Sequence, residues 1–166
     1  MTEERKVTFM WDDPMIGANA ALELAGLDYL QAMIDGKYPP APIAVLFNMK
    51  LLKVEKGYAL FTAEPKEYAY NPIGVVHGGY ATTVLDAAMG CAVHTMLPAG
   101  TAYSTSHISV HLVRPVTAQL GILSCEGKIV HSGRMVATSE ARLVDANGKL
   151  YAHSTCTCAI FPVQRG

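Results

Sequence analysis

The sequence has few charged residues: aspartate, glutamate, lysine and arginine make up 16% of its 166 positions, against about 25% in an average soluble protein. The net charge is −1, while hydrophobic residues reach 51%. A chain this close to neutral gives no sign of binding nucleic acid or an anionic membrane surface. So much apolar side chain in one small domain indicates that part of the surface is buried between subunits.

Long apolar runs are absent as well, because no segment approaches the roughly 20 residues that span a bilayer. Residues 1–6 lack the basic-then-apolar order of a secretory signal. The four cysteines form no Cys-x-x-Cys pair, and Cys156 and Cys158 have a spacing that suits neither a disulfide nor a complete metal site. We therefore expect reduced, mostly buried thiols in a cytoplasmic protein.

Motifs for phosphate loops, dinucleotides and serine hydrolases do not occur. His107 and His111 share one face of an expected strand, but they lie about 13 Å apart, too far for one metal ion. His94 falls near the end of an expected helix, where the helix dipole favours a positive charge. No metal and no cofactor are expected.

The spacing of apolar residues predicts a helix over residues 18–34, which Gly36 and Pro39-Pro40 end. We expect residues 1–41 to form an arm and this helix, ahead of a main region over 42–166 in a single domain. A second, longer helix is predicted over about 79–96. Strands are expected over 43–54, 57–64, 103–113, 118–131, 134–144 and 149–160. Strands in tight hairpins with few helices predict an α+β fold with an antiparallel sheet.

The long helix is apolar on nearly every side except at Asp86. A helix of this kind is buried all round, so we expect the sheet to wrap around it. A lone carboxylate in such surroundings loses water and needs partners. Asp86 is therefore either a functional acid or a structural one that bonds backbone amides or holds a subunit interface.

His77-Gly78-Gly79 stands at the start of the same helix. The first amides of a helix have no intrahelical acceptor and can stabilise an oxyanion, although the three residues also suit a plain loop-to-helix turn. Gly78 and Asp86 are about 12 Å apart along the helix, too far to act on one carbonyl within one chain. If both act in one reaction, a second copy must supply one of them, which predicts a homodimer with shared sites.

Two further polar residues could assist. Asn71 could bind a carbonyl or a water, or simply form a turn before Pro72. Thr105 is expected on the polar face of its strand with His107, Ser109 and His111, where it could position Asp86 or be an ordinary strand threonine.

The pattern Asn71-x(5)-His77-Gly78-Gly79-x(6)-Asp86 resembles the PaaI-type hotdog thioesterase family. The resemblance continues through Thr105, Leu112 to Pro115, Gly133-Arg134 and Asn147-Gly148-Lys149, and covers about residues 42–161. It implies a hotdog fold, in which the sheet wraps around the 79–96 helix. It also implies a dimer that pairs sheets edge to edge, often doubled into a tetramer, with active sites at the dimer interface.

The resemblance implies hydrolysis of an acyl-CoA thioester, with Asp86 as nucleophile or general base. The Gly78 amide would polarise the carbonyl, Asn71 and Thr105 would hold the carbonyl or the water, and His77 would orient the loop. The substrate-binding positions that it implies are Gly79, Arg114, Gly133 and Arg134. The two arginines match positions near the nucleotide end of coenzyme A, where arginine suits phosphate, but each is equally compatible with a surface charge.

Two alternatives to hydrolysis stay open. One is a hotdog module that binds or senses acyl-CoA without turnover, although such a module has no need for a buried acid. The other is a hydratase, which is less favoured because the paired acid and histidine of a catalytic loop are not evident. The acyl group is undetermined among aryl-acetyl, benzoyl and medium-chain groups.

Overall fold

A single six-stranded antiparallel sheet forms the body of the protein, in a computed structural model that describes residues 4–163. The strand order is β1-β2-β4-β5-β6-β3, so β1 and β3 are the two edges. The strands are β1 (Met49–Glu55), β2 (Tyr58–Ala63), β3 (Thr101–Leu112), β4 (Leu123–Ser132), β5 (Val136–Val144) and β6 (Leu150–Pro162).

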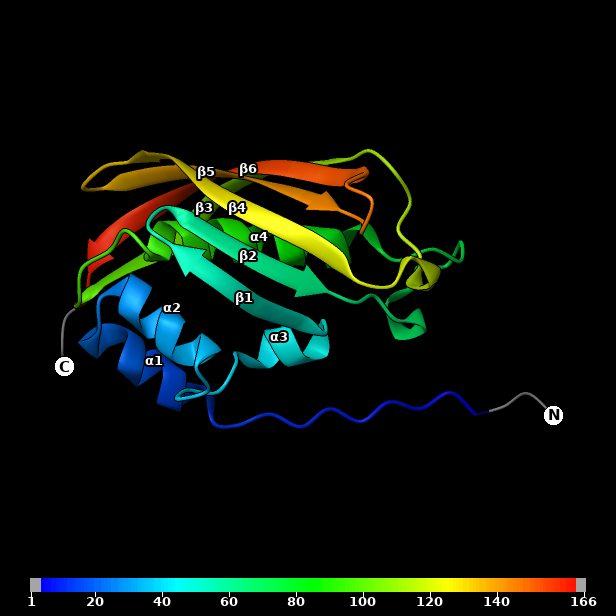
Figure 1. The fold of residues 1–166 in the computed structure, drawn as a ribbon, viewed down its shortest axis with the longest axis horizontal. Coiled ribbons are helices and arrows are strands. Elements are labelled where there is room, and N and C mark those ends of the chain that lie inside the picture. Colours follow the sequence, from blue (N-terminus) through cyan, green and yellow to red (C-terminus); the bar gives the residue numbers. More distant parts are fainter. Residues whose placement is uncertain (1–3, 164–166) are drawn as a thin grey trace.

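The sheet curves around one long helix, α4 (Gly78–His94) (Figure 1). The α4 side chains that face the sheet are fully buried: Val84, Leu85, Ala88, Met89, Ala92 and Val93. The α+β hotdog fold expected from the sequence is thus confirmed, with the helix two residues shorter at its end than expected. Among the described residues, no helix is long and apolar enough to cross a bilayer.

The expectation that this helix is buried on all sides is wrong for the single chain. Thr83, Asp86, Ala87, Cys91 and His94 are only half-buried, and their spacing places them along one stripe of α4. The sheet covers the opposite side of the helix, and the stripe faces the helices that come from the N-terminal part of the chain.

Those N-terminal helices also differ from the expected single helix over 18–34. The structure has α1 (Pro14–Glu23) and α2 (Gly26–Ile34), followed by α3 (Pro42–Leu46). The break is needed because Gly26 lies against the end of α4: its amide donates to the Leu97 carbonyl at 2.9 Å, and a Cβ there would lie 1.8 Å from the His94 carbonyl oxygen. Residues 4–13 form an extended arm along the outside (Figure 1).

Several strand boundaries are shifted by short helices. The strand expected from residue 43 begins at Met49, because Pro42 is the first residue of α3 and Asn48 takes a positive φ of 49°. The strand expected from residue 118 begins at Leu123, after a 3₁₀ turn at Ala118–Leu120. A second 3₁₀ turn, Glu67–Ala69, precedes the loop into α4.

His94 lies in the last turn of α4, as expected, but it is packed among aromatic rings. Its ring lies between those of Tyr29 and Tyr103, with centroids 5.7 and 5.6 Å away. Burial lowers the pKa of His94, so the imidazole is neutral at pH 7. Desolvation disfavours the charged form of the ring.

Strand β4 lies directly against α4 at Gly127, where a Cβ would lie 2.1 Å from the Ala88 carbonyl oxygen. Gly127→Ala should push β4 away from α4 and lower the free energy of unfolding by about 2 kcal/mol or more. Chemical denaturation measures this loss. Ser124→Ala, at a half-buried position of the same strand, is the control, with an expected loss below about 1 kcal/mol. Equal losses in both variants would contradict the close contact.

Candidate active site

The start of α4 is shaped by the side chain of His77, the residue just before the helix. Its Nδ1 accepts a hydrogen bond from the Gly79 amide at 2.9 Å. The Gly79 amide, expected to border the substrate, is therefore already occupied. The Gly78 amide has no backbone acceptor among the described residues and is the open donor at this helix end.

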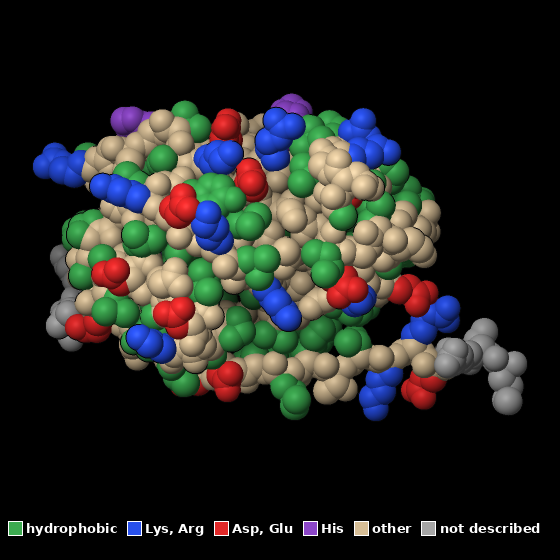
Figure 2. Space-filling model, in the orientation of Figure 1, with side chains coloured by type: hydrophobic (Ala, Val, Ile, Leu, Met, Phe, Trp, Pro, Cys, Tyr) green, Lys and Arg blue, Asp and Glu red, His purple; other side chains and the backbone are tan. Residues whose placement is uncertain are grey.

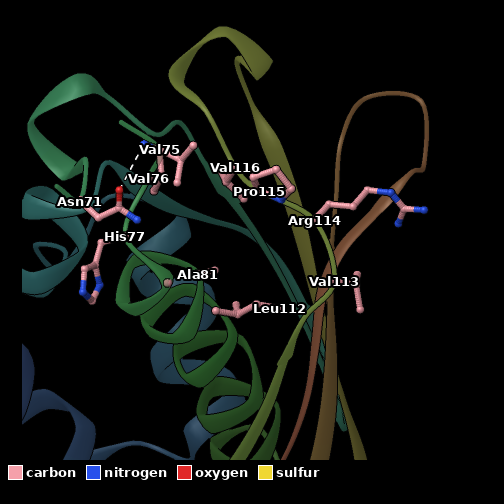
Figure 3. Close-up of a pocket in the computed structure, with 11 residues that line it drawn as sticks. Asn71, Val75, Val76, His77, Ala81, Leu112, Val113, Arg114, Pro115 and Val116 are labelled. Carbon is pink, nitrogen blue, oxygen red and sulfur yellow. Dashed lines mark hydrogen bonds between the residues drawn. The ribbon is translucent and has the colours of Figure 1, made fainter. Parts of the chain in front are cut away.

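Gly78 also lies directly under strand β3, since a Cβ there would lie 2.5 Å from Leu112 Cδ1. Figure 3 shows Leu112 reaching from the strand toward the first turn of the helix. The glycine thus lets β3 approach the helix start.

Asn71 forms the turn that was one of the two roles considered for it. Its Oδ1 accepts from the amides of Ile73 and Val75 at 3.1 and 3.3 Å, which closes the loop ahead of the helix (Figure 3). Its Nδ2 has no partner among residues 4–163 and can donate to another molecule.

Asn71, His77 and Gly78 line one cavity of about 260 Å³ together with the chain from Leu112 to Val116. Arg114 also belongs to this lining, but its side chain points away from Asn71 and His77 (Figure 3). Its guanidinium donates to the Leu150 carbonyl at 2.5 Å. Four of the expected site residues therefore lie together at the start of α4.

Asp86 lies in a different cavity, of about 430 Å³, which is lined by α1, α4 and the first part of β3. Its Oδ1 accepts a hydrogen bond from the Thr105 hydroxyl at 3.0 Å. The acid and the threonine thus form a pair, as one of the two interpretations of Thr105 proposed.

The expected face of Thr105 is nevertheless wrong. The pairing of β3 with β6 shifts between Thr105 and His107, which leaves Ser106 as an extra residue in a β-bulge. The bulge lets Thr105 face α4 even though Ile108, an odd number of residues away, packs against the core. Alternation along an unbroken strand would have placed them on opposite faces.

A series of contacts between buried side chains links Thr105 to the backbone of α4. Its hydroxyl lies 3.9 Å from Cys158 Sγ, which is 3.7 Å from Cys156 Sγ. Cys156 is 3.1 Å from the Ser139 hydroxyl, and Ser139 donates to the Met89 carbonyl of α4. The four cysteines are unbonded thiols, as expected, and all but Cys91 are buried.

Cys91 is the thiol nearest to the acid along the open stripe of α4. Burial and the Asp86 carboxylate raise its pKa to about 12. A thiol with this pKa is almost entirely protonated at neutral pH, so Cys91 is not an activated nucleophile. No cluster of three or more metal-binding side chains occurs within residues 4–163.

The remaining expected residues, like Gly78 and Asp86, lie at two different ends of the sheet. Gly133 and Arg134 lie in the turn between β4 and β5. Beside this turn, Val136 of β5 pairs with Ala159 of β6, which pairs in turn with Ser104 of β3. Ser104 is next to Thr105, so this is the end of the sheet that lies near Asp86. Arg114 lies at the opposite end, where the neighbouring Val113 amide donates to the Tyr151 carbonyl. One chain therefore carries the expected site in two separate halves.

Comparisons with known proteins identify the family. The model of the thioesterase superfamily matches residues 73–152, a stretch that includes His77, Gly78, Asp86 and Thr105. A Saccharolobus solfataricus protein, provisionally named an esterase, is 30% identical over 63% of this chain and 73% of its own length. The chain belongs to the thioesterase superfamily. It is a thioester hydrolase, and the resemblance seen in the sequence is confirmed.

Further relatives of this thioesterase include 1,4-dihydroxy-2-naphthoyl-CoA hydrolase of Listeria monocytogenes, 26% identical over 68% of this chain and 90% of that protein. Among solved structures, a phenylacetic acid degradation-related protein from Ralstonia eutropha JMP134 has a TM-score of 0.72 and 27% identity, over 79% of this chain and 98% of that one. The E. coli PaaI protein shares the fold, with a TM-score of 0.70 and 18% identity over 86% and 97% of the two chains.

The pKa of Cys91 provides a test of how close the thioesterase's acid lies to this thiol. Because the Asp86 carboxylate contributes to the raised pKa, Asp86→Asn should lower it and speed alkylation of Cys91 by iodoacetamide at pH 8 several-fold. Mass spectrometry of the labelled protein measures the rate. Asp28→Asn, on the exposed side of α2, should leave it unchanged, and an equal rate in both variants would show that Asp86 and Cys91 do not interact.

Proposed function

We propose that the protein hydrolyses acyl-CoA thioesters at sites shared between two copies of the chain. The observation that carries this proposal is the separation of the site into two cavities. The amide donors at Gly78 and Asn71 are in one cavity, and the Asp86 carboxylate with Thr105 is in the other. Neither cavity alone holds both a carbonyl-polarising group and an acid.

Strand β3 is the surface on which two copies would meet. It is a sheet edge of 12 residues, and its sequence contains no lysine, arginine, aspartate or glutamate. The other edge, β1, carries Lys50, Lys53 and Glu55. Charged side chains protect an edge strand against pairing, so β1 is protected and β3 is suited to pair with a second copy.

Antiparallel pairing of two β3 strands would reunite the halves. Thr105 contacts Asp86 near one end of the strand, and Leu112 contacts Gly78 near the other. A two-fold axis that crosses β3 midway between these positions places each Thr105 opposite the partner's Leu112. The acid of one subunit then lies beside the helix start of the other, and the dimer has two equivalent sites.

In such a site the chemistry follows from the groups present. The thioester carbonyl accepts a hydrogen bond from the Gly78 amide, which stabilises the negative charge that develops on oxygen. The Asp86 carboxylate, oriented by the Thr105 hydroxyl, attacks the carbonyl carbon or removes a proton from the attacking water. If the carboxylate attacks, the carbon–sulfur bond breaks to leave an acyl–Asp86 anhydride, which water then hydrolyses. If water attacks, it displaces the sulfur directly. In both cases the sulfur takes up a proton, so coenzyme A leaves as a thiol and the acyl group leaves as a carboxylic acid. No metal ion or cofactor is needed in this proposal.

The choice of coenzyme A as the thiol rests on two supports. The Listeria relative is named as a hydrolase of a CoA thioester. Arg114 of one subunit and Arg134 of the other would lie at the same end of the paired sheets, where guanidinium groups suit the phosphates of the nucleotide.

The Gly78 amide can be removed with little other change. Gly78→Pro deletes the donor at the first helical position, where proline is tolerated, and the preceding His77 already has the extended ψ of 137° that proline requires. We expect thioester turnover to fall about 100-fold or more. Gly78→Ala adds a Cβ but keeps the N–H, so it should retain most activity in the same thiol-release assay. An equal loss in both variants would attribute the effect to crowding against Leu112 and remove the amide from the mechanism.

Sharing of the site between subunits is tested by mixing two inactive variants. Asp86→Asn and Gly78→Pro damage opposite halves, so a mixed dimer keeps one intact site. After dissociation and reassociation of equal amounts, activity should recover to about a quarter of the wild-type value, because half of the dimers are mixed. Wild-type protein treated in the same way is the control. No recovery would place the reaction within one chain.

A broad panel of acyl-CoA thioesters tests hydrolysis itself. If wild-type protein binds these thioesters but cleaves none, the module that binds acyl-CoA without turnover is favoured.

A further inference from the structure

A large cavity beside the Asp86 cavity has no role in the chemistry described so far. It has a volume of about 690 Å³ and lies between α2, α3, β1 and the open stripe of α4. Ala87, His94 and Tyr103 line both cavities, so the larger one begins where the space around the acid ends.

We propose that this larger cavity, the acyl chamber, binds a bulky apolar acyl group of the thioester, and that helices α1 and α2 set the size of acyl group that the enzyme accepts. The inference rests on the proposed function, since it takes the thioester carbonyl to lie at Asp86. It assigns a role to residues 14–34, which lie outside the stretch matched by the family model.

The position of the acyl chamber fits an acyl group. A carbonyl held at Asp86 has two substituents, the sulfur and the acyl carbon. In the paired arrangement the partner's Gly78 cavity takes the coenzyme A side, so the acyl carbon must leave on the other side. That side leads past Ala87 to the acyl chamber.

The chemistry of the lining fits an uncharged occupant. Most of the lining is apolar and includes Leu30, Met33, Ile34, Met49, Leu51 and Phe61. Lys50 is its one charged residue, and it is exposed on the edge strand β1. His94 contributes a neutral ring, because burial lowers its pKa. An acyl group with a carboxylate of its own would lose its hydration without gaining a buried cation.

The size fits a bulky group and not an acetyl group. Sites for drug-sized ligands measure roughly 300–1,000 Å³, and the acyl chamber falls in the middle of that range. An acetyl group would leave most of it empty. On the face shown in Figure 2, hydrophobic side chains gather above the extended arm, around α3 at the outer side of this region.

The N-terminal helices are fixed firmly enough to act as a wall. The Gly26 amide donates to the Leu97 carbonyl, and the Gly100 amide donates to the Leu22 carbonyl at 3.0 Å. These two bonds join the α1–α2 pair to the segment that follows α4. Ala18, Ala21 and Leu22 of α1 then border the Asp86 cavity, and Tyr29 and Met33 of α2 border the acyl chamber. A wall held in place can discriminate by size.

The test is the ratio of kcat/KM for a bulky thioester to that for acetyl-CoA. Octanoyl-CoA and phenylacetyl-CoA serve as aliphatic and aromatic probes. Wild-type protein should prefer at least one of them. Met33→Trp and Ala44→Phe, which fill the chamber from α2 and α3, should each lower the ratio about 10-fold or more. Asn19→Phe, on the exposed side of α1, should leave it unchanged, and acetyl-CoA turnover reports the folding of each variant.

The outcomes separate this inference from the proposed function. A lowered ratio for either probe supports the acyl chamber and shows which shape it takes. Unchanged ratios for both probes in both filled variants, or a wild-type preference for acetyl-CoA, would overturn it while hydrolysis itself stands. If wild-type protein cleaves no thioester, binding measured by calorimetry tests the inference separately. Octanoyl-CoA or phenylacetyl-CoA should then bind more tightly than coenzyme A, and Met33→Trp should remove that difference in affinity. Any other result would show that the chamber does not bind the acyl group.

Discussion

A single curved sheet can cover only one side of the helix that it surrounds, and the other features of this protein depend on that limit. Helix α4 has an apolar surface on nearly every side, but the six strands bury only the side with Val84, Leu85 and Met89. The stripe through Asp86, Ala87 and Cys91 stays half-buried. This is the place where a carboxylate can keep access to a substrate and still be surrounded by apolar side chains that exclude water.

The chain covers the uncovered stripe with its own N-terminal helices, but loosely. The α1–α2 pair rests on the segment after α4 through Gly26 and Leu22, and cavities remain between these helices and the stripe. A tightly packed cover would add stability and remove the space for a ligand. The N-terminal helices therefore close the open side of α4 while leaving room beside the acid.

Much of the fold could be predicted from the sequence because its signals are local. The apolar run after Gly79 predicts α4, and Asn147-Gly148 marks the last hairpin. The break between α1 and α2 could not be predicted, because it depends on contact between Gly26 and the His94 carbonyl, 68 residues away. The neutral state of His94 likewise depends on two tyrosine rings from α2 and β3 that only tertiary structure brings together.

The candidate site, too, could be predicted from the sequence only where its signals are local. Asn71, His77, Gly78 and Asp86 could be chosen by residue type and spacing, and the helix rise alone shows that Gly78 and Asp86 cannot meet within one chain. The pairing of Thr105 with Asp86 was one of two interpretations, and alternation along the strand gave it the wrong face. Cys158, Cys156 and Ser139 were missed as supports of Thr105, because they belong to other strands and have no motif of their own.

The bulge at Ser106 affects how β3 can pair with a further strand. A regular strand with a period of two can slide along another by two residues and still present the same faces. Strand β3 is not regular in this sense, because its alternation changes phase between Thr105 and His107. A second copy that pairs with β3 along its whole length must therefore accommodate one extra residue on each strand. The residue that turns Thr105 toward the helix thereby also sets a condition on how two sheets can join.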